Sequence, residues 1–429
     1  MSRSPRVLVA RLREGGQASE GAWGLVFEVT SMLGTLLAFT LLGRSLGAEG
    51  YGQYASLYAI AGPFITLAGA GVTLALLQHV VRDGEPLSVT ARSCLSITLA
   101  LGALLTAAGT VAALQVIDSL AVVAIVTILL IEFLTTPLVN LAASVRQTET
   151  YAGAVRIRIL LVLGRAVILV VLFLAGQLTV ASLGITQLIW SATLAWMVLR
   201  VVGAQYGFRL APGRVHRRHL KSNVVFSTAI TADGIANEGD KVVLAGSGFS
   251  VDTGLYAAAY RIVALGSVPV GALVNSSHKR FLENQEGRRR EHLDLALRYS
   301  AVAGAYGLVV GLAIFVTAPL FPIVMGQEFE GSVTILRWLS PLVFLRAVGI
   351  FSLNGLMGLG KVGLRTVIIV ANAAVGVVLF LILIPDRGWE GAVIASLITE
   401  AAQVVMTWTA LVVCQRRADR RITEPSEPA

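Results

Sequence analysis

Charged side chains stand inside long apolar stretches of this sequence, where only pairing or ligand binding would normally retain them. Arg165 and Arg346 fall near the middle of two such stretches, and Glu132, Asp233 and Glu400 fall near the middle of three others. A charge at the centre of a membrane-spanning helix costs about 2.5 to 3.5 kcal/mol. The two arginines are therefore candidates for holding an anion. The three acids are candidates for binding a cation or for neutralising the arginines in structural pairs.

Further charges lie nearer the ends of apolar stretches. Arg261 lies about two turns into its stretch, whereas Lys241 and Arg337 lie close enough to an end for their side chains to reach the membrane surface. Glu238 is three residues before Lys241, a spacing that predicts a local ion pair on one helix. Arg261 and Lys241 are secondary candidates for binding an anion.

The acids include one candidate for coupling to a proton or a sodium ion. Asp233 and Asn237 are four residues apart and share a helix face. A carboxylate beside an amide supplies coordinating oxygens, so Asp233 is the expected ion site if one acid binds an ion. Glu28, near one end of the first apolar stretch, is a weaker candidate.

The elements that must hold these charges are membrane-spanning helices. Hydrophobic residues make up 55% of the chain and charged residues only 14%, far more apolar than a soluble globular protein. Twelve apolar runs are long enough to cross about 30 Å of hydrocarbon as helices. They cover 23–42, 53–78, 93–116, 120–141, 159–175, 178–199, 224–247, 255–277, 299–325, 333–359, 366–384 and 391–414. The run 120–141 is nearly continuous in apolar residues, which excludes the alternating pattern of a β-barrel.

Basic residues mark one side of these runs. With the N-terminus inside, most of the 34 lysines and arginines fall in the termini and in inner loops, including 214–221 and 287–292. Only Arg44 and Arg387 fall in outer loops. This asymmetry predicts a multi-pass protein of the inner (plasma) membrane with both termini cytoplasmic. The clusters are expected to contact anionic membrane lipids, and no nucleic acid is expected because no soluble reading domain is present.

The chain repeats itself. Residues 51–60 (YGQYASLYAI) resemble 253–262 (TGLYAAAYRI), residues 170–174 resemble 377–381, and Pro-Leu-Val occurs at both 137–139 and 341–343. The matches are collinear and separate equivalent runs by an even number of crossings. We therefore expect an all-α integral membrane protein with twelve transmembrane helices in two six-helix halves related by an internal repeat, with a central cavity between the halves. That is the architecture of a transporter.

The repeat also predicts the domain boundaries. We expect a cytoplasmic N-terminal segment at 1–22, six-helix halves at 23–203 and 224–414, a basic connector at 204–223 and a cytoplasmic tail at 415–429.

No motif of an enzyme or of a metal site is found. Cys94 and Cys414 lack metal-like spacing and are expected to be small packing residues. The five histidines stand at loop edges or at the ends of runs, where solvated surface positions are expected. They are His79, His216, His219, His278 and His292. No P-loop or nucleophile elbow is present, so no cofactor and no enzymatic activity are expected.

Three stretches carry a family resemblance. Residues 43–72 contain Leu46-Gly47, Tyr51-Gly52 and Tyr54, and they are followed in order by DKVVLAGSGFSVDTGLYAAAYRIVAL at 240–265 and GLMGLGKVGLRT at 355–366. In order and spacing they resemble the Wzx-type polysaccharide flippases of the multidrug/oligosaccharidyl-lipid/polysaccharide exporter superfamily. The resemblance implies alternating access that moves a polyprenyl-diphosphate-linked oligosaccharide from the inner to the outer leaflet, for cell-surface polysaccharide export. A glycan polymerase or assembly machinery is a further expected partner.

The resemblance implies a role in transport for each group of candidate residues. An anionic cargo would need a cationic cavity, for which the candidates are Arg165, Arg346, Arg261 and Lys241. Tyr51, Tyr54, Tyr58, Tyr256 and Tyr260 are expected to be anchors at the membrane interface. Alternatively, the i, i+4 pairs Tyr54 with Tyr58 and Tyr256 with Tyr260 would form a gate that stacks on sugars, and the acids would accept hydrogen bonds from sugars.

Three other functions fit parts of the sequence less well. A multidrug/cation antiporter of the same superfamily is the main alternative, although it would favour acids and aromatics over central arginines. The loop at 79–89 lacks the signature of major-facilitator carriers. A scaffold or polymerase subunit is a third alternative, but a polymerase would need a larger outer loop than this chain offers.

Overall fold

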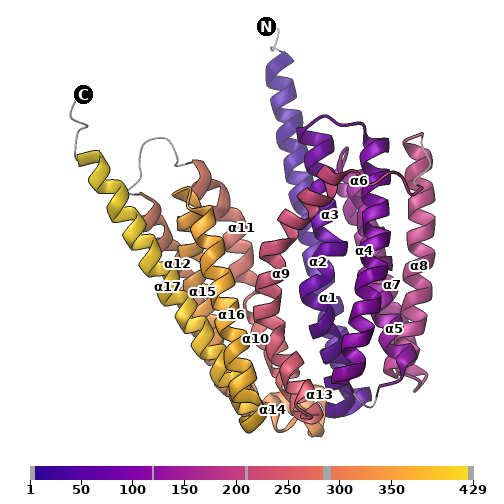
Figure 1. The fold of residues 1–429 in the computed structure, drawn as a ribbon, viewed down its shortest axis with the longest axis vertical. Helices are drawn as coiled ribbons and strands as arrows, with labels where there is room; N and C mark the ends of the chain where they lie inside the picture. Colours follow the sequence, from indigo (N-terminus) through magenta and orange to yellow (C-terminus); the bar gives the residue numbers. More distant parts are fainter. Residues whose placement is uncertain (1–4, 118–119, 208–210, 284–290, 424–429) are drawn as a thin grey trace. The chain divides into compact units, whose positions relative to one another are not determined.

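The computed structural model describes residues 5–117, 120–207, 211–283 and 291–423, which fold as helices joined by short turns (Figure 1). Nine helical segments in this part of the chain are long and apolar enough to cross a membrane. The all-helical membrane fold is therefore confirmed. The basic residues at 288–290 and the end of the predicted tail lie outside the described ranges.

The nine segments and the twelve predicted runs differ for two reasons. The first segment, Val26–Arg82, contains two predicted runs, because α1 (Pro5–Ala61) and the helices that follow it leave no gap. The predicted runs 224–247 and 255–277 are absent from the nine. The first lies in α9 (Arg217–Gly246), which carries several charges, and the second is divided between two short helices. The number twelve stays a prediction.

Gly47 interrupts α1 where the sequence predicts the first outer loop. Its backbone is non-helical, with φ 68° and ψ −175°, in the left-handed region that favours glycine. The helix restarts at Ala48, whose backbone N–H donates to Glu328 Oε2 at 3.2 Å. This side-chain acceptor satisfies one of the donors that a helix N-terminus leaves unpaired. A single run of helix thus contains a true break.

Contacts divide the chain into two compact units. Unit 1 holds residues up to Leu46 and Ile60–Thr231. After the first part of α1 it contains η1 (Gly62–Phe64), α2 (Ile65–Ala68), α3 (Ala70–Leu77), η2 (Gln78–Arg82), α4 (Leu87–Val116), α5 (Val122–Leu130), η3 (Ile131–Thr135), α6 (Thr136–Gln147), α7 (Tyr151–Leu174), α8 (Val180–Gln205) and the first part of α9. Its core includes Leu76, Cys94, Leu141 and Leu194. The expected packing position of Cys94 is confirmed.

Unit 2 holds Gly47–Ala59 and Ala232 onwards. After the second part of α9 it contains α10 (Ser250–Gly266), α11 (Val268–Glu283), α12 (Glu291–Thr317), η4 (Ala318–Leu320), α13 (Phe321–Met325), η5 (Gln327–Phe329), α14 (Ser332–Leu339), α15 (Pro341–Gly358), α16 (Val362–Arg387) and α17 (Trp389–Thr423). Its core includes Phe281, Phe351, Leu356 and Leu411, with Cys414 packed against it. The predicted halves 23–203 and 224–414 divide the chain close to these units and stay a prediction.

Outward-facing apolar side chains follow the long helices. On α7, Leu160, Leu163, Val167, Val171 and Leu174 are all exposed. Their spacing of three or four residues places them on one helix face. An aqueous surface would make such a stripe unfavourable, whereas lipid tails solvate it. The stripe is therefore a lipid-facing surface.

Prolines lie at helix breaks in both halves of the sequence. Pro63 lies in η1, and Pro269 is the second residue of α11, just after the break at Ser267. Both Pro-Leu-Val motifs lie at the start of a helix, because Pro137 is in the first turn of α6 and Pro341 begins α15. Proline cannot donate the backbone hydrogen bond of a helix interior, so each one favours a local break. The breaks therefore follow the internal similarity of the sequence.

Candidate functional site

Arg346 lies at the centre of a polar cluster in unit 2. Its Nε donates to Glu400 Oε1 at 2.6 Å, and its Nη2 donates to Asn237 Oδ1 at 2.9 Å and to the Tyr260 hydroxyl. The guanidinium also lies 5.1 Å from the centroid of the Tyr260 ring, within the range of a cation–π interaction. These partners come from α9, α10 and α17, so four helices meet at one arginine.

Small residues let α15 and α17 bring this pair together. A Cβ added to Gly349 would lie 3.1 Å from Val404, and one added to Gly355 would lie 2.9 Å from Leu411. Glycines at these two levels allow the backbones to approach closely, as is common between membrane helices. The short Arg346–Glu400 contact depends on that approach.

A small polar cavity adjoins the cluster. It encloses about 40 Å³ and is lined in part by Arg346, Glu400 and Asn372. The Asn372 amide donates to Gln403 Oε1 at 2.8 Å, whereas its own buried Oδ1 has no hydrogen-bond partner. A water needs about 10–15 Å³ of such space and two or more polar partners. The cavity therefore suits a water molecule or a small ion and is too small for a lipid headgroup.

Lys241 belongs to a second, buried network next to this cluster. Its Nζ lies 3.0 Å from Glu238 Oε2, which confirms the predicted local ion pair, and 3.3 Å from Asp240 Oδ1. Asp240 also accepts a hydrogen bond of 2.6 Å from the Tyr256 hydroxyl. Asp240 is 1% exposed and was missed as a site residue, although it stands beside Lys241 in the stretch that carries the family resemblance. Its pairing with Lys241 and Tyr256 is what makes its burial tolerable.

In unit 1, Arg165 pairs with Glu132. Arg165 Nη1 lies 3.5 Å from Glu132 Oε1, and Nη2 donates to Thr136 Oγ1 at 2.6 Å. Glu132 lies in η3, a π-helical turn inserted between α5 and α6. Such turns occur frequently at functional sites. Arg165 Nε is buried without a hydrogen-bond partner, so part of this guanidinium remains available.

The remaining charged candidates lie elsewhere. Arg261 and Glu28 are exposed on their helices. Asp233 belongs to α9, but its side chain lies outside the described residues. The predicted partnership between Asp233 and Asn237 therefore stays a prediction. Asn237 itself contacts Arg346.

The interpretation of the tyrosines as interface anchors is wrong for three of the five. Tyr51, Tyr256 and Tyr260 are only 6%, 0% and 7% exposed, so protein rather than headgroups surrounds them. The Tyr256 hydroxyl donates a hydrogen bond to Asp240. The Tyr260 hydroxyl donates to Asn237 and accepts from Arg346. Their polar partners inside the protein explain the burial. The rings of Tyr54 and Tyr58 lie 4.7 Å apart and are half-buried, and their proposed contact with sugars stays a prediction.

The two repeated Gly-x-Tyr motifs contact each other within unit 2. A Cβ on Gly52 would collide with the Ser250 carbonyl and lie 2.8 Å from the Gly254 nitrogen. A Cβ on Gly254 would collide with the Ala48 carbonyl and lie 3.1 Å from the Gly52 nitrogen. Only glycine at both places permits this crossing of α1 and α10. The sequence repeat is thus also a structural contact.

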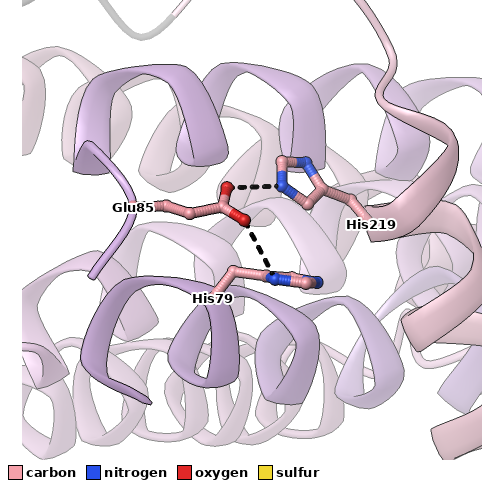
Figure 2. A group of neighbouring side chains, drawn as sticks. All are labelled: His79, Glu85 and His219. Carbon is pink, nitrogen blue, oxygen red and sulfur yellow. Dashed lines mark hydrogen bonds and ion pairs between the residues drawn. The ribbon is translucent and has the colours of Figure 1, made fainter. Parts of the chain in front are cut away.

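Three of the histidines are buried, contrary to the expectation of solvated positions. His79, His219 and His292 are 6%, 0% and 1% exposed, and the side chain of His278 lies outside the described residues. Figure 2 shows His79 and His219 on either side of Glu85. His79 Nδ1 lies 3.1 Å from Glu85 Oε1, and His219 Nε2 lies 2.9 Å from Glu85 Oε2. The expectation failed because His219 is 134 residues from Glu85 in the sequence and reaches it only through folding.

The surroundings of Glu85 fix its charge state. Burial alone would raise the pKa of Glu85, but hydrogen bonds from His219 and Thr90 and the charge of Arg218 lower the pKa overall. The pKa of His219 is lowered, chiefly by burial, although Glu85 opposes this effect. The cluster therefore favours an ionised carboxylate beside a neutral imidazole at neutral pH.

Comparison with known proteins agrees with this architecture. The fold is similar to an inward-facing conformation of a multidrug resistance MATE family transporter of the MOP superfamily, with a TM-score of 0.76, 16% identity, and coverage of 92% of this chain and 96% of that chain. It is also similar to an outward-facing conformation of such a transporter, with a TM-score of 0.61, 16% identity, and coverage of 90% and 95%. At these identities the likeness shows the fold alone.

A third similar structure is a MOP superfamily transporter from Pyrococcus furiosus, described as having a binding pocket of reversed polarity, which suggests a different function. Its TM-score is 0.59 with 14% identity, and coverage is 92% of this chain and 93% of that chain. No curated protein sequence matches the chain. A family profile described as "Polysaccharide biosynthesis protein" matches residues 19–277, more than half of the chain. The chain therefore belongs to the polysaccharide biosynthesis protein family.

Proposed function

We propose that this transporter is a flippase that moves a polyprenyl-diphosphate-linked oligosaccharide from the inner to the outer leaflet of the plasma membrane by alternating access. The family match supports a role in polysaccharide export. The proposal includes twelve spans in two six-helix halves with both termini cytoplasmic, and the matched helix breaks support the internal repeat. The observation that supports an anionic, diphosphate-linked cargo is the placement of Arg346.

Arg346 keeps a positive charge in the middle of an apolar helix. Its side chain is 22% exposed, so the protein does not enclose it completely. A guanidinium presents a planar fork of donors that matches phosphate oxygens, which is why arginine is favoured at phosphate sites. A diphosphate that approaches this arginine could take over the place of the Glu400 carboxylate. Arg165, with its unpartnered Nε, offers a second such guanidinium in unit 1.

The membrane potential favours the proposed direction. An inside-negative potential assists the outward movement of an anion by about 2.3 kcal/mol per charge per 100 mV. A diphosphate could therefore cross without a coupled ion. Coupling to a proton or sodium ion through Asp233, Glu132 or Glu400 is possible in this scheme but is not required by it.

One observation favours a second candidate function, the multidrug/cation antiporter. Both central arginines are paired with a carboxylate, Arg346 with Glu400 and Arg165 with Glu132. If those pairs are permanent, the arginines are structural and contribute no net positive charge to a cargo site. The two functions therefore differ in whether a central arginine contacts the cargo.

The test is lipid mass spectrometry on cells depleted of the protein and complemented with variants. The flippase proposal expects a polyprenyl-diphosphate oligosaccharide to accumulate on depletion and the wild-type protein to clear it. Arg346→Lys should fail to clear it, because lysine keeps the charge but loses the fork. Arg337→Lys, at an exposed arginine on α14, is the matched control and should complement. An unchanged lipid pool, together with new sensitivity to cationic drugs, would support the antiporter instead.

A further inference from the structure

We propose that His79, Glu85 and His219 form a binding site for a divalent transition-metal ion of the Zn²⁺ type (Figure 2). The site would join η2 and the turn between η2 and α4 to the first turn of α9, all within unit 1. Two imidazole nitrogens and one carboxylate oxygen are a donor set that such ions prefer. The proposal is independent of the cargo, since none of the three residues belongs to the Arg346 or Arg165 clusters.

The geometry of the donor atoms fits a single ion. All three donors lie within 4.8 Å of one another. The carboxylate oxygens of Glu85 lie 3.1 Å from His79 Nδ1 and 2.9 Å from His219 Nε2. A tetrahedral Zn²⁺ with bonds of about 2.0–2.1 Å places neighbouring donors roughly 3.3 Å apart. Closing the widest separation that this limit allows to tetrahedral spacing would take movements of about 1.5 Å, shared among the three side chains.

The residues around the donors are those that support a metal site. The other ring nitrogen of His79, Nε2, lies 3.1 Å from Ser222 Oγ, a partner that would fix the ring and leave Nδ1 for the metal. Thr90 Oγ1 donates to Glu85 Oε2 at 3.2 Å, and Arg218 Nη2 lies 3.0 Å from the same oxygen. These contacts hold the carboxylate in place. Metal-ligating histidines and carboxylates usually have outer partners of this kind.

A fourth ligand and the burial of the site are also provided. Asp83 Oδ2 lies 3.0 Å from His79 Nδ1, and its side chain is 36% exposed. Either this carboxylate or a water could complete the coordination. The three principal ligands are shielded, with side chains 7%, 9% and 0% exposed for His79, Glu85 and His219. Exclusion of water strengthens the interactions of a bound cation.

The place of the site suggests what the ion would do. α9 runs from unit 1 into unit 2, and His219 lies in its first turn. An ion held by His79 and Glu85 would attach that first turn to η2 and to the turn before α4. The bound ion would thus give α9 a fixed anchor on unit 1. Its removal should weaken that anchor while leaving the buried networks around Arg346 intact.

The test uses the full chain in detergent, purified without a histidine tag and freed of metal by a chelator. Co²⁺ is added as the spectroscopic probe, and Zn²⁺ is then used to displace it. The proposal expects one equivalent of Co²⁺ with the absorption bands of tetrahedral coordination, lost on addition of Zn²⁺. Glu85→Gln and His219→Gln should each lower the affinity about 100-fold or more, because each removes a direct ligand.

His216→Gln is the matched control. His216 lies on the same basic segment with its ring 5.3 Å from that of His219, but it is not one of the three donors. This variant should bind Co²⁺ like the wild type. Melting in the metal-free state checks that every variant folds, and Zn²⁺ should raise the melting temperature of the wild type and of His216→Gln but not of Glu85→Gln. No tetrahedral Co²⁺ spectrum, or equal Zn²⁺ stabilisation of Glu85→Gln, would overturn the proposal and leave a metal-free hydrogen-bonded cluster.

Discussion

At the scale of single residues, the ion pairs decide how charges persist in apolar helices. Arg346 and Glu400 are 22% and 17% exposed, so each depends on the other for most of its compensation. Removing one member of a buried pair leaves the other charge uncompensated, which costs about 3–5 kcal/mol when burial is complete. The partial exposure here reduces that cost but does not remove it.

We therefore expect Glu400→Gln to lower the melting temperature markedly, because Arg346 loses its counter-charge. The double variant Arg346→Gln/Glu400→Gln should recover more than half of the lost melting temperature, since neither charge is then left without its counter-charge. Thermal unfolding in detergent measures both. Arg337→Gln is the control, because Arg337 is exposed, and it should change the melting temperature little.

The same variants separate structure from function. If Arg346 binds the cargo, the double variant regains stability without regaining transport. A double variant that restores both would show that Arg346 is only structural, and equal melting temperatures for Glu400→Gln and the wild type would show that the pair contributes nothing.

Tyr256 gives a second prediction at this scale. Its hydroxyl donates to the buried Asp240 carboxylate at 2.6 Å, and the other contact of that oxygen, with Ser396 Oγ, is 3.5 Å long. Tyr256→Phe should therefore destabilise the protein by about 1.5–3 kcal/mol, as for a hydrogen bond to a charged group. Tyr306→Phe removes a neutral hydrogen bond to the Gly266 carbonyl and should cost about half as much. Chemical unfolding compares them, and an equal cost would contradict the special role of Asp240.

The sequence revealed some of these residues and not their partners. The spacing of Glu238 and Lys241 predicts their pair, because both lie on one helix. Arg346 and Glu400 could be identified as buried charges, but their contact depends on how α15 packs against α17. The burial of Tyr256 was missed because an amphipathic side chain near the end of an apolar run suits a membrane interface equally well.

At the scale of helices, glycine and proline set the crossings and breaks. Pro-Leu-Val appears in the sequence as a repeat, and in the structure each copy stands where one helix gives way to the next. The lengths of most spans could be predicted because hydrocarbon thickness dictates them. The π-helical turn η3 could not, since it reflects how residues around Glu132 pack rather than any local pattern.

The crossing at Gly52 and Gly254 leads to a prediction. Gly254→Ala would place a methyl group against the Ala48 carbonyl, so we expect a loss of about 1–3 kcal/mol from overpacking. Gly271→Ala, in α11, meets no atom within 4 Å and should be neutral or slightly stabilising. Melting temperatures in detergent compare the two variants. Equal behaviour would mean that α1 and α10 do not cross as closely as the structure has them.

At the scale of the whole molecule, the number of crossings determines which side of the membrane each terminus occupies. Nine crossings would place the termini on opposite sides, whereas the proposed twelve place both in the cytoplasm. The segment Val26–Arg82 bears on the difference. Its 57 residues would extend about 86 Å as one straight helix, nearly three times the hydrocarbon thickness. With the break at Gly47, it is long enough to cross twice.

We therefore expect cysteines introduced before residue 23 and after residue 414, in a chain with Cys94 and Cys414 replaced by alanine, to be protected from an impermeant thiol reagent in intact cells. A cysteine at Ser247, in the turn between α9 and α10, should be labelled, because the twelve-span topology places that turn outside. A cysteine at Asp83, in the turn after η2, should be protected until the membrane is permeabilised. Labelling of only one terminus would replace the even number of crossings by an odd one. The close approach of Gly52 to Gly254 places both Gly-x-Tyr motifs on one side of the membrane, so the additional or missing crossing would then lie before Gly52 or after Gly254.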